Sequence, residues 1–251
     1  MKRSIKSLNG YTMAATDGEI GTVEDFYFDD ESLTVRYVIV NTGYWWFGKK
    51  VLIPTDTLDN ADWELKSFPI NLTREEIRNS PDVDTEKPVS RQQEAGLHKY
   101  YGRPNYWSPG GFSVGVWGLT GTVPLATKRI PDENADSEDR RDYNVHLRST
   151  QELKGYRIHG VDGKVGELDD FIIDDNTWKL HYLVIDTGGW LPGKRVLLSP
   201  KCIEEISWAD ATIFINLPAD EIEKGPEYDP SNAVNVLHEN LLYDYYGRPH
   251  K

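Results

Sequence analysis

Short apolar runs separated by turn-forming residues dominate the first part of the chain. Residues 37–40 form a nearly continuous apolar run after Val35, which favours a strand buried in the middle of a sheet. Residues 20–28 predict a long twisted strand before it, and Asp17-Gly18 predicts the hairpin turn at its start. Two shorter strands are expected at 51–53 and 64–68. The pattern is therefore that of a mainly β module.

The same pattern recurs 145 positions later without a gap. Leu8-Asn9-Gly10-Tyr11 aligns with Leu153-Lys154-Gly155-Tyr156, and Tyr100-Tyr101-Gly102-Arg103-Pro104 aligns with Tyr245-Tyr246-Gly247-Arg248-Pro249. The shift also aligns Asp17-Gly18 with Asp162-Gly163, Gly21 with Gly166, Asp25-Phe26 with Asp170-Phe171, Asp29-Asp30 with Asp174-Asp175, and Trp45 with Trp190. Chance does not hold one register from end to end, so the chain is an internal duplication.

Three segments follow from the duplication. Residues 1–104 form the first repeat with its helix, 105–147 form a linker, and 148–251 form the second repeat with its helix. The linker is rich in glycine and aromatic residues at first and acidic further on, and its acidic part is typical of a solvated connection.

Short helices are expected beside the strands. Thr73 and Glu76 have the spacing of a capping box. Each copy then closes with an amphipathic helix, capped by Ser90 in the first copy and by Asn235 in the second. Glycine followed by proline ends both helices, at Gly102 in the first copy and at the equivalent position in the second.

The order of these motifs resembles the PRC-barrel family. It runs from Gly-Tyr and Asp-Gly through Asp-Phe and Asp-Asp to an apolar strand, Thr-Gly, Trp and Gly-Lys, and each copy contains it. The resemblance implies two tandem small PRC-type β-barrels, each followed by a C-terminal helix. We expect the two copies to be related by a pseudo-twofold axis, as in a dimer.

The resemblance also implies a type of function. The family includes the cytoplasmic part of the photosynthetic reaction-centre H subunit, the C-terminal domain of a ribosome-maturation factor, and many bacterial proteins of unknown role, some of them suspected in stress responses. Its members act mainly as binding and assembly modules. We therefore expect a non-enzymatic bacterial scaffold protein. An H-subunit-like role in photosynthetic electron transfer is disfavoured, because the sequence contains no membrane helix.

Charge and cysteine content narrow the range of partners. The net charge is −13, with 41 acidic residues against 28 Lys and Arg, which argues against nucleic acid as a partner. No apolar stretch is long enough to insert in a membrane, and no apolar run follows the basic start as a signal peptide requires. Cys202 is the only cysteine, so an intrachain disulfide is excluded and a cytoplasmic location is expected.

No residue pattern indicates catalysis, a metal or a cofactor. The Asp-Asp pairs at 29–30 and 174–175 follow predicted strands, where aspartate caps turn amides. His238-Glu239 lacks the second histidine of a helical zinc motif, and a solvated helix surface is the simpler interpretation. Cys202 has no neighbouring histidine in sequence. We therefore assign no catalytic residue, metal or cofactor.

Aromatic and arginine residues are the candidates for partner binding. Tyr44, Trp45, Trp46 and Phe47 lie together in a turn-rich loop, whose counterpart contains Trp190. If these side chains are exposed, they form an interface for a partner. If they are buried, they cover the open end of the barrel or pack between the two copies. The Tyr-Tyr-Gly-Arg-Pro ends contain Arg103 and Arg248, which either bind a partner carboxylate or merely follow a capped and docked helix.

Two functional hypotheses remain open from the sequence. The first is the binding or assembly module, whose protein partner the sequence does not name and which includes the case of a homodimer. The second is a ligand- or ion-responsive protein with a pocket between the repeats, since such clefts often form where domains meet. Exchange of the closing helices between the copies is a further structural alternative.

Overall fold

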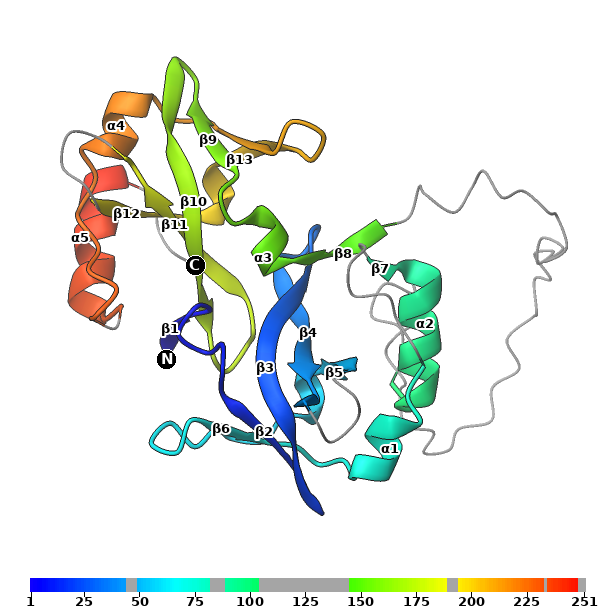
Figure 1. Ribbon diagram of the computed structural model, residues 1–251. Helices are drawn as coiled ribbons and strands as arrows, with labels where there is room; N and C mark the ends of the chain where they lie inside the picture. The colour runs from blue at the N-terminus through cyan, green and yellow to red at the C-terminus, as the bar shows by residue number, and fades with distance from the viewer. Residues whose placement is uncertain (44–48, 82–88, 104–144, 189–193, 233, 248–251) are drawn as a thin grey trace, which may run out of the picture.

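Two β-sheets, one in each copy, make up most of the computed structural model, which describes residues 1–43, 49–81, 89–103, 145–188, 194–232 and 234–247 (Figure 1). The first sheet has the order β5-β4-β3-β2-β6, formed by Lys50–Pro54, Thr34–Asn41, Gly18–Asp29, Thr12–Ala15 and Ser67–Pro69. The second has the order β12-β11-β10-β9-β14-β13, formed by Arg195–Leu198, Leu180–Asp186, Gly163–Asp174, Arg157–Gly160, Thr212–Ile215 and Ile203–Ser207. The predicted mainly β fold in two copies is confirmed.

The central strands are those that the apolar runs predict. β4 pairs with β3 on one side and β5 on the other, and β11 is enclosed in the same way by β10 and β12. A shared glycine lets the long strand pass close to its neighbour: a Cβ on Gly21 would lie 2.0 Å from the Asn41 carbonyl oxygen. At Gly166 the equivalent distance, to the Asp186 oxygen, is 2.1 Å. Any side chain here would push the two strands apart.

The expected turns and caps are present. β2 and β3 form the Asp17-Gly18 hairpin, and the Asp17 carboxylate accepts the N–H of Arg74, 2.8 Å away, at the start of α1 (Arg74–Arg78). Thr73 and Glu76 make the capping box. One strand prediction is partly wrong: β6 begins only at Ser67, because residues 63–66 form a turn with Lys66 in the left-handed region.

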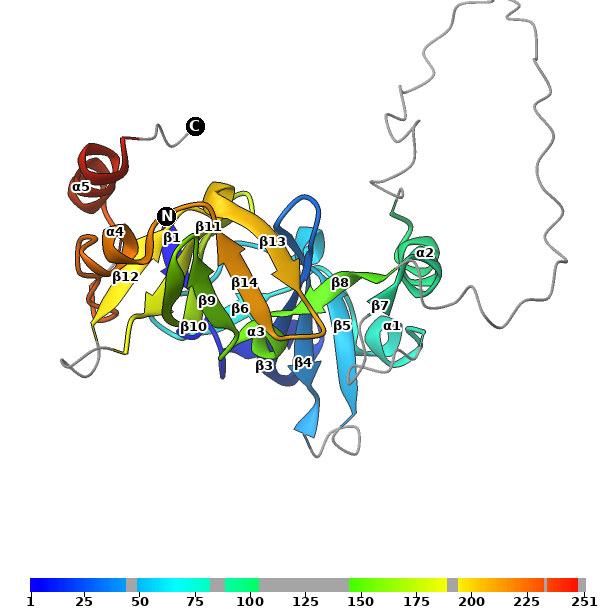
Figure 2. The same cartoon turned by 90° about the horizontal axis from the view of Figure 1, so that it is seen from above.

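Both closing helices pack on their own copy. Ser90 caps α2 (Arg91–Tyr100), and Asn235 caps α5 (Val236–Tyr246). Gly247 ends α5 in the left-handed conformation. Leu97 of α2 is buried against the first sheet, and Leu242 of α5 is buried against the second. The helices lie at opposite ends of the molecule and are not exchanged between copies (Figures 1 and 2).

The strands that precede each copy are exchanged instead. β1 (Lys2–Ser4) pairs with β10 of the second copy, and β8 (Val145–Ser149) pairs with β3 of the first (Figure 1). The two pairings have the same register, because Ser4 faces Ile172 and the equivalent Ser149 faces Tyr27. β8 also pairs with β7 (Val89–Ser90) just before α2. Each sheet is thus completed by a strand from the other repeat.

A pseudo-twofold axis passes between Thr34 and Lys179, which form a bridge although they are equivalent positions. Around it the Val35 N–H donates to the Trp178 carbonyl, and the Leu180 N–H donates to the Leu33 carbonyl, both at 2.8 Å. A single apolar cluster, with Phe26, Phe28, Phe171 and Leu183 among its members, contains buried residues of both copies. The copies therefore share one core, and the expected pseudo-twofold relation is confirmed.

Candidate functional site

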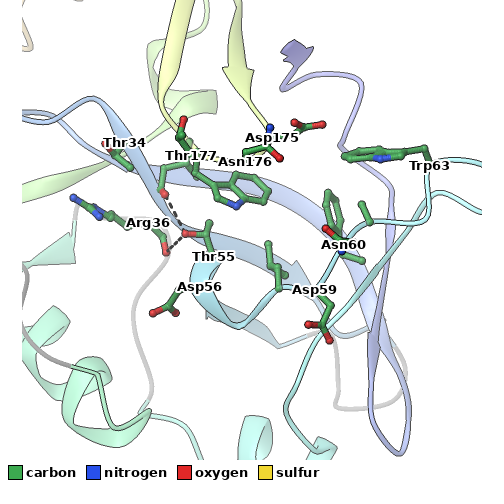
Figure 3. Close-up of a pocket in the computed structure, with 15 residues that line it drawn as sticks. Thr34, Arg36, Thr55, Asp56, Asp59, Asn60, Trp63, Asp175, Asn176 and Thr177 are labelled. Carbon is green, nitrogen blue, oxygen red and sulfur yellow. Dashed lines mark hydrogen bonds between the residues drawn. The ribbon is translucent and has the colours of Figure 1, made fainter. Parts of the chain in front are cut away.

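A cleft of about 600 Å³ lies between the copies (Figure 3). Its first-copy wall comes from the start of β4, the turn η2 (Thr55–Thr57) and the loop up to Trp63. Its second-copy wall is the turn between β10 and β11. The lining residues are Thr34, Val35, Arg36, Thr55, Asp56, Leu58, Asp59, Asn60, Ala61, Trp63, Phe68, Asp175, Asn176, Thr177 and Trp178.

The second-copy turn places a tryptophan against the first sheet. Asp174 holds this turn by accepting the N–H groups of Asn176 and Thr177 at 3.0 and 2.9 Å. Trp178 adopts a φ of 58° at the end of the turn. Its ring centroid lies 6.2 Å from that of Phe26 and 6.2 Å from that of Phe68, both in the first copy. The aromatic wall of the cleft therefore depends on contact between the copies.

The first-copy wall is held by Thr55, whose hydroxyl bonds to the backbone of β4. The Thr55 hydroxyl lies 3.2 Å from the Val35 carbonyl oxygen and 3.3 Å from that of Arg36 (Figure 3). Arg36 donates to the Ser32 hydroxyl at 3.4 Å. These groups fix the wall where β4 enters the interface.

An arginine of the exchanged strand closes the rim. The Arg3 guanidinium carbon lies 3.3 Å from the centroid of Trp63, and its Nε donates to Asp175 at 2.8 Å. On the other side of the pseudo-twofold axis, Arg148 lies 4.0 Å from the Trp208 ring and 3.7 Å from Asp30. Each arginine therefore joins a tryptophan of its own repeat to a carboxylate of the other, which favours the assembled form by cation–π and charge attraction.

Carboxylates lie along the first-copy side of the cleft. Asp56 pairs with Arg103 at 3.3 Å, and its side chain remains 56% exposed. Asp59 and Asn60 are exposed, and their side chains make no hydrogen bond or ion pair within the described part of the chain. Arg103 was one of the predicted partner-binding residues, and its backbone N–H also donates to the His98 carbonyl at 2.7 Å. Ligand-binding groups are therefore available in the cleft.

The pseudo-equivalent cavity on the other side is almost filled, with a volume of about 10 Å³. Six of its lining positions match six in the open cleft. In the cleft they are Val35, Thr55, Leu58, Ala61, Phe68 and Trp178. In the closed cavity they are Leu180, Pro200, Ile203, Ile206, Ile213 and Leu33, in that order. Ile206 in place of Ala61 adds three carbon atoms, and Thr55 supplies a hydroxyl where the closed cavity has Pro200.

A proline accounts for the difference in the backbone. In the second copy, β13 pairs with β14 along its length, with Glu205 opposite Phe214. In the first copy the two ends of this hairpin are bridged, at Leu58 and Asp62, and between them the Asp59 N–H donates to the Pro69 carbonyl at 2.9 Å. Pro69 stands at the position of Phe214, and proline has no N–H to donate to a ladder. Residues 59–61 accordingly form no strand, and the cleft opens beside them.

Two buried carboxylates hold the exchanged strands. Asp25 accepts from the hydroxyls of Ser149 and Thr150, the latter at 2.7 Å, and from the Gln151 N–H at 3.2 Å. Asp170, its equivalent, accepts from the Ser4 hydroxyl and from the Lys6 N–H at 3.1 Å. Burial raises the pKa of both carboxyls above the ordinary value of 3.8, against these hydrogen bonds. Their neighbours indicate a structural role at the interface.

The Asp-Asp pairs serve two purposes, only one of which the sequence predicted. Asp29 accepts the Ser32 N–H at 2.7 Å, so the first aspartate caps the turn as expected, as Asp174 does. Asp30 and Asp175 instead pair with Arg148 and Arg3 of the exchanged strands. The repeated Arg-Ser at positions 3–4 and 148–149 was the available signal for this contact.

The prediction that His238 lies on a solvated helix surface is only partly correct, because the side chain is half-buried. Its ring centroid lies 5.9 Å from that of Tyr228, and burial lowers its pKa. Cys202 is buried in the shared core. Tyr44, Trp45, Trp46, Phe47, Trp190 and Arg248 lie outside the described residues.

Neither a metal-binding cluster nor a membrane-spanning helix is found among the residues that the structure describes. Within those ranges, no group of three or more His, Cys, Asp or Glu side chains is arranged to hold a metal ion. None of the described helices is long and apolar enough to cross a membrane.

Comparison with known proteins identifies the class. The model of the PRC-barrel domain matches residues 3–76 and 148–222, together more than half of the chain. The protein belongs to the PRC-barrel family and contains two such domains in tandem. The chain is also 27% identical over 108 residues to an uncharacterized protein of Deinococcus radiodurans. That match covers 43% of this chain and 37% of the relative's length.

Proposed function

We propose that this protein is a non-enzymatic binding protein of the bacterial cytoplasm and that its ligand binds in the cleft between the two PRC-barrel domains. The observation that carries the proposal is the inequality of two equivalent cavities, about 600 Å³ against about 10 Å³. A structural requirement of the fold would apply to both sides of the pseudo-twofold axis. Only one side is open, and its volume lies in the range of ligand sites.

The lining is suited to binding. Aromatic rings and aliphatic side chains provide contact area, while Asp59 and Asn60 present polar atoms without partners among the described residues. Burial raises the pKa of Asp25, Asp30 and Asp170 at the interface, and all three carboxylates contact the exchanged segments. The arrangement therefore supports recognition without a chemical step.

A thermal-shift panel of metabolites and short peptides tests the proposal. A ligand present at a hundred times its dissociation constant should add about 2.7 kcal/mol to the free energy of unfolding, or about 5 °C or more in melting temperature. Ala61→Ile, which copies the closed cavity, should remove the shift while the variant remains folded. Ile213→Val, a conservative change in the closed cavity, should retain it. A blank panel, or a shift that survives Ala61→Ile, would argue against the cleft as the site.

A second candidate, assembly by self-association, is favoured by helix α5. Val236, Leu237 and Leu241 are 68%, 74% and 56% exposed, whereas the first copy has Arg91, Gln92 and Gly96 at these positions. The exposed leucines lie one helical turn apart, so two copies of the helix can pair antiparallel about Leu241. Sedimentation velocity of the wild type and of Leu237→Gln/Leu241→Gln tests this. A dimer that the variant loses supports it, and a monomeric wild type contradicts it.

A further inference from the structure

The lining of the open cleft carries a net negative charge. Its charged side chains are three carboxylates, of Asp56, Asp59 and Asp175, and one guanidinium, of Arg36. Asp59 has no hydrogen bond or ion pair among the described residues. A lining of this charge favours a positively charged occupant.

The arginines near the cleft are already engaged. Arg36 donates to Ser32, Arg103 pairs with Asp56 at 3.3 Å, and Arg3 pairs with Asp175. The pair with Asp56 is partly exposed, so it leaves this carboxylate able to accept from a further donor. Asp59 is the acidic group of the lining that an added cation would neutralise.

The molecule shows at its own rim how such a cation is held. Arg3 lies over the Trp63 ring and donates to Asp175, and both of these residues line the cleft. Trp178 provides a second indole in the same cavity. An indole beside a carboxylate is the combination that binds guanidinium and ammonium groups, since the ring face attracts the charge and the carboxylate accepts its hydrogen bonds.

We propose that the cleft binds an organic cation, an ammonium or guanidinium-type group on an aromatic or apolar body. The cationic group lies toward Asp56 and Asp59, and the body contacts Trp178 and the aliphatic wall. This inference rests on the proposed function, because it assigns a ligand class to the same cleft.

Three small probes of the same shape separate charge from shape: benzamidine, a cation; benzamide, which is neutral; and benzoate, an anion. Isothermal titration calorimetry of each into the intact protein gives the affinities. We expect benzamidine to bind at least tenfold more tightly than benzamide and benzoate not to bind measurably. The benzamidine affinity should fall as salt is raised from low to physiological concentration, whereas that of benzamide should stay constant.

Matched variants locate the effect. Asp56→Asn/Asp59→Asn should reduce the benzamidine affinity about tenfold, to that of benzamide, and leave benzamide binding unchanged. Glu19→Gln/Glu64→Gln removes the same number of charges from exposed positions outside the cleft and should leave the benzamidine affinity within about twofold of wild type. Circular dichroism and melting temperature verify that all the variants are folded.

The outcomes distinguish this inference from the proposed function. If benzamide or benzoate binds as tightly as benzamidine, and Ala61→Ile abolishes binding, the cleft is a binding site but the cation assignment is wrong. If benzamidine binds equally well to Ala61→Ile, its site lies elsewhere and the inference is overturned. If none of the probes binds the wild type at millimolar concentration, the cation assignment fails, and the thermal-shift panel decides the proposed function independently.

Discussion

The open cleft and the closed cavity occupy equivalent places on the two sides of the pseudo-twofold axis, but their volumes differ. Both lie where the turn of one repeat meets the sheet of the other, and six of their lining positions are equivalent. Ile203 and Ile206 fill the closed cavity from a regular edge strand, whereas Pro69 and Ala61 leave the cleft open. A few side chains on a duplicated scaffold are thus enough to convert core into cleft, because a packed interior leaves no space unless atoms are removed.

The interface around the cavities is more symmetric than the cavities themselves. Strand exchange, the buried aspartates and the arginine–tryptophan contacts all occur on both sides of the axis. The same substitution can therefore be made at equivalent positions of both copies, and the two losses of stability can be compared directly.

The largest effect is expected at the buried carboxylates. Asp25→Ala leaves two hydroxyls and an N–H of the exchanged segment without their acceptor, and we expect a loss of about 3 kcal/mol in the free energy of unfolding. Asp170→Ala removes fewer contacts from the exchanged segment and should cost about 2 kcal/mol. Urea unfolding measures both values. Losses under about 1 kcal/mol in both variants would show that the carboxylates do not hold the exchanged strands.

The closed cavity should respond more than the open one to a change in volume. Ile206→Ala removes packed atoms and should cost about 2 kcal/mol. Ala61→Ile enters existing space, and its effect should be below about 1 kcal/mol in either direction. The same unfolding assay compares them. An equal cost for the two substitutions would mean that the cavities do not differ in solution as they do in the structure.

The arginine with the shorter contact distances should contribute more to the free energy of unfolding. Arg3 lies closer than Arg148 to both its tryptophan and its carboxylate. Replacement of Arg3 by Ala should cost about 1 kcal/mol, and that of Arg148 about half as much. Double-mutant cycles with Trp63→Leu and Trp208→Leu isolate the ring contribution. A coupling energy that is larger at Trp208 would reverse this ranking.

The smallest effect is expected in the pH dependence of stability. Because burial raises the pKa of Asp25 and Asp170, the folded state binds protons more tightly than the unfolded state there. The stability they contribute is present below the ordinary pKa of 3.8 and is lost as pH rises through their raised values. Relative to Asp25→Asn/Asp170→Asn, the wild type should therefore lose free energy of unfolding as pH rises above about 4. A parallel pH profile for the two proteins would contradict the raised pKa values.

Much of the fold could be predicted from the sequence because its signals are local. The central strands, the turn at Asp17 and the caps at Thr73, Ser90 and Asn235 each depend on residues close together in the chain, and the duplication follows from matching the two copies directly. The hairpin turn and the helix caps follow from backbone hydrogen bonding, and the central strands follow from continuous apolar runs.

The strand exchange and the cleft depend on contacts distant in sequence, which the pattern does not specify. Arg3-Ser4 and Arg148-Ser149 repeat with the same shift as the rest of the duplication, but the repeat alone does not say which sheet each strand joins. Residues 59–61 form no edge strand because Pro69, ten residues from Asp59, has no N–H to donate to them. The division at 1–104, 105–147 and 148–251 and the aromatic-loop surface stay predictions.

The crystal structure of the protein, grown with the compound that raises its melting temperature most, tests the central claim directly. We expect the compound to occupy the open cleft, in contact with Trp178 and beside Ala61, and to be absent from the cavity lined by Ile203 and Ile206. Density for the compound in both cavities, or only at a surface away from the junction of the copies, would show that the cleft is not the specific binding site.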